Sequence, residues 1–170
     1  RIVAGLLVEH MGEEGKVIIT TLDASAQWSL DRESGVREVL DKYSGIEVYA
    51  TINCGTEPQD YYANIENAVL TYPDLTGIVS LECCTNPAAG EIVKREGLSK
   101  DIVVVGFDLL DTTLTLIKSG DIAATIDQDP YTQGYEAIAL VYKAIQGEEV
   151  SDVDTGALVV DNTNIDEFLK

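Results

Sequence analysis

The feature that most constrains the fold is a regular alternation of short apolar segments with longer segments of helical spacing. Residues 102–105 are Ile-Val-Val-Val, and a segment that is apolar at every position is typical of a strand buried on both faces. Helical patterns separate such segments, which indicates parallel strands joined by crossovers. We therefore expect an α/β fold, a parallel, doubly wound, flavodoxin-like three-layer sandwich. Its strands are expected at residues 16–22, 45–54, 76–81, 102–105, 121–127 and 155–160.

The longest helical pattern covers residues 130–147, with Pro130 favouring its start and Gly147 its end. One face of this helix is apolar, with Tyr135, Ile138, Ala139, Tyr142 and Ile145. An exposed apolar face of this size favours association, so we expect it to pack on another part of the protein or to drive self-association. The chain also opens in a helical pattern with no strand before it, which suggests a fragment of a longer protein.

The charge of the chain limits its partners. The sequence has 11 Lys and Arg residues against 30 Asp and Glu residues, a formal net charge of −19. Nucleic acids and anionic membrane surfaces are bound through basic residues, so neither is expected as a partner. No run of about 18 apolar residues is present, and we expect no direct membrane insertion.

The three cysteines, Cys54, Cys83 and Cys84, do not suggest a disulfide framework. Adjacent cysteines bond to each other only with strain. Together with Glu82 they also make a poor metal site, because the sequence has no CxxC or HxxxH spacing. We expect small buried thiols, no metal and no cofactor.

Polar residues follow the predicted strands where a parallel sheet places its ligand site, at the carboxyl ends. Phe107 and Asp108 follow residues 102–105, and Gln128 follows residues 121–127. The loop and helix after the first strand add Trp28 and Arg32. Carboxylates, amides and a guanidinium bind hydroxyl groups, and aromatic rings cover the apolar face of a sugar. This combination suits a neutral polyol.

Each of these residues also has a structural interpretation. Asp108 could cap the helix that follows it, and Asn86 before a proline favours a similar role. Trp28 could cover a helix end, Phe107 could belong to the core, and Arg32 could be a surface arginine. Gln128 could belong to a turn.

Catalytic chemistry has little support in the sequence. No nucleophile elbow or glycine-rich phosphate-binding motif occurs, and the single histidine, His10, precedes the first predicted strand. Without a nucleophile and base, an enzyme has no mechanism to name, and we expect a non-enzymatic protein.

Several segments resemble type I periplasmic sugar-binding proteins, the ribose-binding-like solute receptors of ABC transporters. The resemblance runs through "GKVIIT", "DRESGVREVL", "NPAAGEIV", "DIVVVGFD" and "SGDIAATIDQDPYTQGYEAIALVYKAIQGE" in the order of that family. It implies the second of two lobes that enclose a sugar or small polyol, and an ABC permease as partner. It also implies an extracytoplasmic location, in the periplasm or as a cell-surface lipoprotein.

The resemblance also implies roles for individual residues. Arg32 and Asp108 match residues that hold sugar hydroxyls, Phe107 matches an adjacent ring, and Gln128 matches a hinge glutamine that touches ligand. Cys84 stands near a position where the family often has Asn or Asp. From its residue type and its place after the first strand, Trp28 is also expected to stack on the ligand.

The resemblance predicts three regions: residues 1–128 as the ligand-binding lobe, residues 129–150 as a helix that packs on the missing N-terminal lobe, and residues 151–170 as a closing segment with the final strand. A ligand-sensing domain of a transcriptional regulator or sensor kinase with the same fold is the alternative. A flavodoxin-like enzyme would require a bound cofactor.

Overall fold

The computed structural model describes residues 1–169. Six strands and six α-helices alternate along the chain, and a 3₁₀ helix closes it. The helices are α1 (Ile2–Met11), α2 (Gln27–Leu40), α3 (Pro58–Thr71), α4 (Thr85–Arg95), α5 (Asp111–Ser119), α6 (Pro130–Ile145) and η1 (Ile165–Glu167). The strands are β1 (Glu14–Thr21), β2 (Gly45–Asn53), β3 (Gly77–Ser80), β4 (Val103–Phe107), β5 (Ala124–Asp127) and β6 (Leu158–Asp161).

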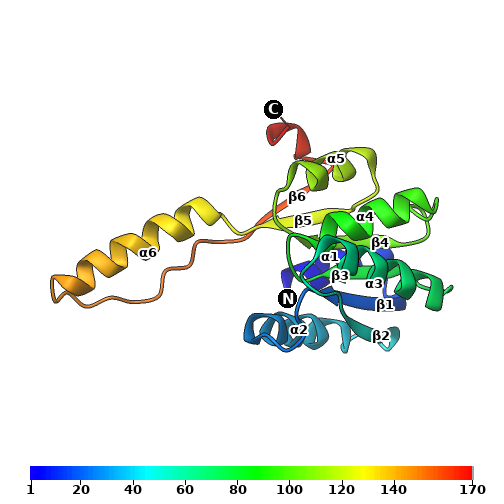
Figure 1. Ribbon diagram of the computed structural model, residues 1–170, viewed down its shortest axis with the longest axis horizontal. Coiled ribbons are helices and arrows are strands. Elements are labelled where there is room, and N and C mark those ends of the chain that lie inside the picture. The colour runs from blue at the N-terminus through cyan, green and yellow to red at the C-terminus, as the bar shows by residue number, and fades with distance from the viewer. Residues whose placement is uncertain (170) are drawn as a thin grey trace.

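The strands form one sheet in the order β2-β1-β3-β4-β5-β6 (Figure 1). The first five strands are parallel, which confirms the expected α/β class. The last strand differs: β6 pairs antiparallel with β5, so that Val160 lies opposite Thr125. The sequence pattern predicted a parallel strand here, and that expectation is wrong for β6. An antiparallel edge needs no crossover onto the sheet, and α6 is free to lie elsewhere.

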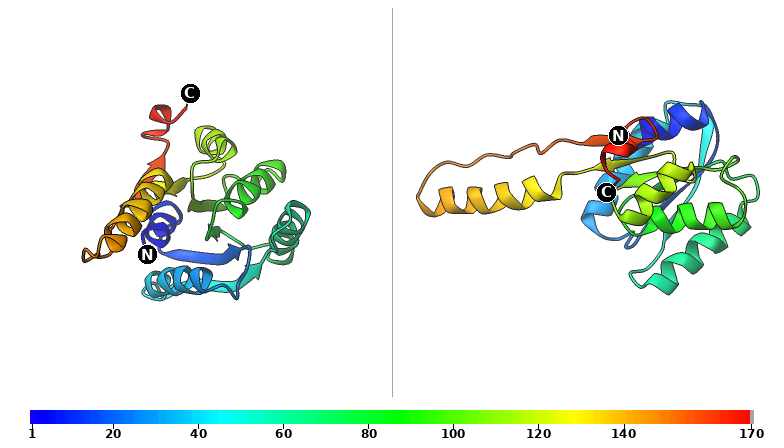
Figure 2. Two further views of the ribbon diagram at one scale, coloured as in Figure 1. Left: turned by 60° about the vertical axis from the view of Figure 1, so that its left-hand side comes forward. Right: turned by 90° about the horizontal axis from the view of Figure 1, so that it is seen from above.

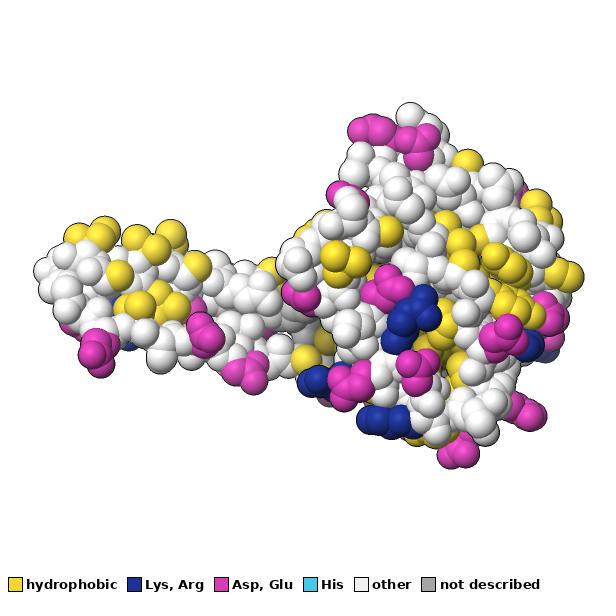
Figure 3. Space-filling model, turned by 90° about the horizontal axis from the view of Figure 1, so that it is seen from below, with side chains coloured by type: hydrophobic (Ala, Val, Ile, Leu, Met, Phe, Trp, Pro, Cys, Tyr) yellow, Lys and Arg dark blue, Asp and Glu magenta, His cyan; other side chains and the backbone are white. Residues whose placement is uncertain are grey.

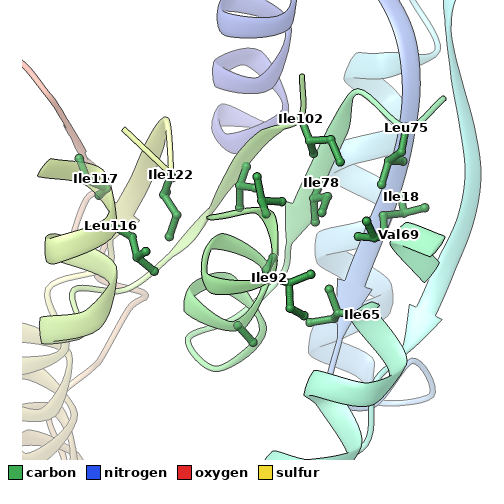
Figure 4. Close-up of a cluster of buried hydrophobic side chains, with 14 of the residues drawn as sticks. Ile18, Ile65, Val69, Leu75, Ile78, Ile92, Ile102, Leu116, Ile117 and Ile122 are labelled. Carbon is green, nitrogen blue, oxygen red and sulfur yellow. The ribbon is translucent and has the colours of Figure 1, made fainter. Parts of the chain in front are cut away.

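Side chains from alternate strand positions form two separate cores, one on each face of the sheet. Helices lie on both faces of the sheet (Figure 2). Ile18 and Ile78 face α3, α4 and α5, where they join Ile65 and Ile92 in the cluster drawn in Figure 4. The adjacent positions, such as Ile19, face α1 and α2 on the other side. Burial on both faces explains why the strands are apolar throughout rather than alternating.

The start of α4 is held by a side chain that precedes the helix. The Glu82 carboxylate accepts hydrogen bonds from the backbone N–H groups of Cys84 (2.6 Å) and Thr85 (3.0 Å). An acidic group at a helix N-terminus also interacts favourably with the helix dipole. Glu82, rather than Asn86, therefore caps α4.

The α6 helix and the segment that returns from it, residues 130–157, project away from the sheet and are called the arm below (Figures 1 and 2). The helix starts at Pro130, as expected, and the Asp129 carboxylate accepts a hydrogen bond from the backbone N–H of Thr132 (3.0 Å). None of its residues is buried. Among residues 1–169, no helix has the length and apolar character needed to span a membrane.

Candidate functional site

Three of the predicted site residues form one hydrogen-bonded chain at the carboxyl ends of the strands. The Arg32 guanidinium donates through Nη2 to Oε1 of Gln128 (2.7 Å), and Nε2 of Gln128 donates to Oδ1 of Asp108 (2.7 Å). A second guanidinium nitrogen, Nη1, donates to the backbone carbonyl of Leu81 at the end of β3 (2.6 Å). The amide of Gln128 thus lies between the cation and the carboxylate, so Arg32 and Asp108 are linked without a direct ion pair.

The backbone of Asp108 is held in an unusual conformation. Its φ of 71° lies in the left-handed region, which Asp tolerates better than most residues. The N–H of Asp108 donates to the Ile126 carbonyl (2.8 Å), and its own carbonyl accepts from the Thr125 hydroxyl (3.1 Å). Such strained positions persist where the surroundings over-determine them and often mark functional sites.

Asp108 does not cap α5. The helix begins at Asp111, with Leu110 at the capping position and no side-chain hydrogen bond there. The interpretation of Asp108 as a helix cap is therefore wrong, because its carboxylate binds the Gln128 amide instead.

Two aromatic rings lie against the same guanidinium. The Arg32 carbon Cζ is 4.6 Å from the ring centroid of Phe107 and 5.6 Å from that of Trp28. Trp28 stands in the first turn of α2 rather than in a loop, and 39% of it is exposed. Arg32 does not pair with the adjacent Glu33, which instead binds Arg37. A guanidinium packed on aromatic rings is oriented and partly shielded from water.

Cys84 follows β3, three residues after Leu81, whose carbonyl accepts the hydrogen bond from Arg32. Its Sγ is 3.4 Å from Sγ of Cys83, and both residues are partly exposed, so the expectation of buried thiols holds only for Cys54. Burial raises the pKa of Cys84 to about 12, and burial also raises the pKa of Cys83, with the Asp108 charge contributing. The thiols are therefore protonated at neutral pH.

The two thiols and the Glu82 carboxylate lie within reach of one metal ion. However, both carboxylate oxygens of Glu82 already accept hydrogen bonds, from Cys84 and Thr85. Two protonated thiols then remain as ligands, which is fewer than the three protein ligands of a catalytic zinc site. The cluster does not support a metal centre.

Asn86 is a site-supporting residue that the sequence analysis interpreted as a helix cap. Its side chain is buried and donates from Nδ2 to the Thr125 hydroxyl (3.2 Å) and the Phe107 carbonyl (3.4 Å). A Cβ on Gly106 would stand only 2.4 Å from Cγ of Asn86, so this position requires glycine. A glycine inside an apolar strand was the available signal, because it marks a close approach of another group.

Gln128 also connects the site to both segments of the arm. Its backbone carbonyl accepts from Nε2 of Gln133 in α6 (2.7 Å) and from the hydroxyl of Thr155 in the returning segment (3.4 Å). An open hollow of about 470 Å³ lies where the two segments of the arm meet the body, and it is lined by Phe107, Gln128 and Arg1, among others. In the space-filling view, a basic group is surrounded by acidic and apolar side chains on one face of the body (Figure 3).

Comparison with known proteins gives sugar-binding relatives. Residues 1–149 match the family described as periplasmic binding protein domain. The xylose/arabinose-binding protein XylF of Sulfolobus acidocaldarius is 27% identical over 146 residues, which are 81% of this chain and 36% of that protein. The D-apiose import binding protein of Actinobacillus succinogenes is 25% identical over 168 residues, 96% of this chain and 54% of that protein.

Among solved structures, a carbohydrate transporter solute-binding protein of Agrobacterium radiobacter in complex with D-arabinose superposes with a TM-score of 0.90. It is 30% identical, and the match covers 96% of this chain and 58% of that one. These proteins are named for binding and transport rather than for a catalysed reaction, which agrees with the expectation of a non-enzymatic protein. The chain thus spans between about a third and three fifths of the length of these relatives. Because the family model matches residues 1–149, the chain belongs to the periplasmic binding protein domain family.

Proposed function

We propose that this chain forms the second lobe of an extracytoplasmic solute-binding protein, which encloses a sugar or small polyol between two lobes and delivers it to an ABC permease. The observation that carries the proposal is the hydrogen-bonded chain from Arg32 through Gln128 to Asp108. It lies where ligands bind in open parallel sheets, beyond the carboxyl ends of the strands. The relatives named for xylose, arabinose and apiose indicate the ligand class.

The donors and acceptors of this chain suit sugar hydroxyls. Arg32 uses two of its five N–H groups within the protein, and Asp108 uses Oδ1. Oδ2 of Asp108 accepts no hydrogen bond from residues 1–169 and can accept one from a sugar hydroxyl. Trp28 and Phe107 offer ring faces to the apolar side of a pyranose or furanose. We assign Cys84 to the rim of this site, where a thiol replaces a stronger hydrogen-bonding group.

The arm indicates how this lobe would contact the first lobe. The α6 face with Tyr135, Ile138 and Tyr142 is exposed by 64–73% in this chain. We infer that residues 129–150 pack on the first lobe and that residues 151–170 return to close the second. Gln128 stands where the arm leaves the body, so it would link ligand contact to the angle between the lobes.

The test is calorimetric titration of the full-length protein with D-arabinose, D-xylose and D-ribose. Asp108→Asn keeps the size of the side chain and tolerates the left-handed backbone, but it removes the charge. A hydrogen bond to a charged group contributes about 1.5–3 kcal/mol, so we expect affinity to fall about ten- to hundredfold. The matched control is Asp101→Asn, because Asp101 is exposed at the opposite end of the same strand.

Equal affinities of Asp108→Asn and the wild-type protein would remove Asp108 from the site. Failure of the wild-type protein to bind any of the three titrated sugars would contradict the proposed function as a whole.

A further inference from the structure

The two adjacent cysteines at the rim of the site lie unusually close together. Sγ of Cys83 and Sγ of Cys84 are 3.4 Å apart, and both side chains are partly exposed. Cys54, by contrast, is fully buried. The pair follows β3, two residues after the Leu81 carbonyl that accepts the hydrogen bond from Arg32. Only one residue, Glu82, separates the pair from this carbonyl.

We propose that Cys83 and Cys84 form a reversible vicinal disulfide, a thiol–disulfide exchange site that reshapes the rim of the sugar site. The proposal rests on the proposed function, because an extracytoplasmic protein meets oxidising conditions in which disulfides form and persist. The oxidant is a disulfide-bearing protein or a low-molecular-weight disulfide.

The exchange balances without a metal or cofactor. One cysteine, as thiolate, attacks the disulfide of the oxidant, forms a mixed disulfide and releases one thiol. The second cysteine then attacks the first cysteine sulfur and releases the other thiol. The two cysteine sulfurs are oxidised, the disulfide of the oxidant is reduced, and the two protons end on its thiols.

The bond is strained, and the strain makes it reversible. Consecutive Cα atoms are about 3.8 Å apart across a trans peptide, whereas disulfides usually join Cα atoms about 4.4–6.8 Å apart. Strained disulfides are reduced more readily than structural ones. Closing the gap between the sulfurs must also move the backbone at Cys84, whose N–H is held by Glu82. We therefore expect oxidation to disturb the support that Leu81 gives to Arg32.

The experiment treats the full-length protein with oxidised glutathione at mildly alkaline pH, because burial raises the pKa of both thiols. The protein is then denatured, its free thiols are alkylated, and its mass is measured. We expect the peptide that contains Cys83 and Cys84 to escape alkylation and to be lighter by the mass of two hydrogen atoms, whereas Cys54 is alkylated. A mild monothiol should restore all three thiols. Fragment masses identify the bonded pair.

Cys83→Ser and Cys84→Ser are the matched controls. Neither should give the product lighter by two hydrogen atoms, and the variant that keeps the attacking cysteine should stop at a mixed disulfide with one glutathione. The lighter product in either variant, or its absence from the wild-type protein, would overturn the proposal. Sugar affinity is then measured in both redox forms, and the oxidised form should bind about tenfold more weakly. Equal affinity of the two forms would overturn the reshaping of the site. If neither form binds sugar, the proposed function has failed, whereas the thiol count still decides whether the exchange site exists.

Discussion

Helices α5 and α6 contain the same kind of apolar pattern, yet they have opposite environments. In α5, Leu116 and Ile117 are buried in the core on one face of the sheet, where α5 packs on α4, whereas in α6 no residue is buried and Ile138 is 73% exposed. The space-filling view shows apolar side chains along the arm (Figure 3). The comparison teaches that helical periodicity identifies a face that needs a partner but does not identify the partner. For α5 the partner is the core that it shares with α4, and for α6 we have proposed the first lobe.

The same substitution in the two helices should have very different effects on stability. Ile117→Ala leaves a cavity in the core and should lower the free energy of unfolding by about 2–5 kcal/mol. Ile138→Ala removes an exposed side chain and should change it by less than about 0.5 kcal/mol. Urea denaturation of the 170-residue chain measures both values. Similar losses in the two variants would show that α6 is packed in solution and would break the comparison.

A second prediction concerns association of the 170-residue chain through the α6 face. Burying one large apolar side chain contributes about 1.5–3 kcal/mol, so the face should drive self-association at high concentration. Replacing Ile138 and Tyr142 together by Glu should raise the concentration of half-association more than tenfold. Light scattering over a concentration series measures this shift.

The matched control for association is Leu70→Glu, which removes a residue of similar exposure, 68%, from α3 on the body. It should leave association unchanged. A wild-type chain that stays monomeric at high concentration, or a Leu70→Glu variant that dissociates as readily, would contradict the prediction.

A third and smaller difference is expected between the contributions of charged residues of the body and of α6 to stability. Burial by itself pushes the pKa of Asp121 up, but hydrogen bonds from Lys94, Ser119 and Ser99 outweigh burial and leave the pKa below its usual value. The stabilisation is therefore complete above the pKa of an unfolded aspartate, about 3.9, and is lost as the pH falls through the lower folded value.

Asp121→Asn should therefore lower the free energy of unfolding at neutral pH by about 1.5–3 kcal/mol and weaken its fall below about pH 4. Glu136→Gln in α6 is the control and should change neither quantity, because no hydrogen bond or ion pair is recorded for Glu136 within residues 1–169. Denaturation at several pH values tests both variants. An unchanged acid profile in Asp121→Asn would remove Asp121 from the stabilising groups of the body.

The strands and helices were largely predictable because they depend on local periodicity. Residues 102–105 are apolar at every position, and β4 lies at Val103–Phe107. The start of α6 followed from Pro130. The start of α4 was not predictable in the same way, because Glu82 caps the helix from outside its usual capping position. The direction of β6 depends on where the arm returns, and the local sequence contains no signal for that.

Local sequence patterns were sufficient for the α/β class and for the set of residues that follow the strands, because burial on two faces and the edge rule for parallel sheets act through patterns of a few residues. How these residues combine depends on long-range contacts. Arg32 and Gln128 are 96 positions apart in the sequence, and the left-handed backbone of Asp108 is fixed by a hydrogen bond to β5. The sheet order sets such contacts between distant residues, and no local pattern encodes the distance at which two side chains meet.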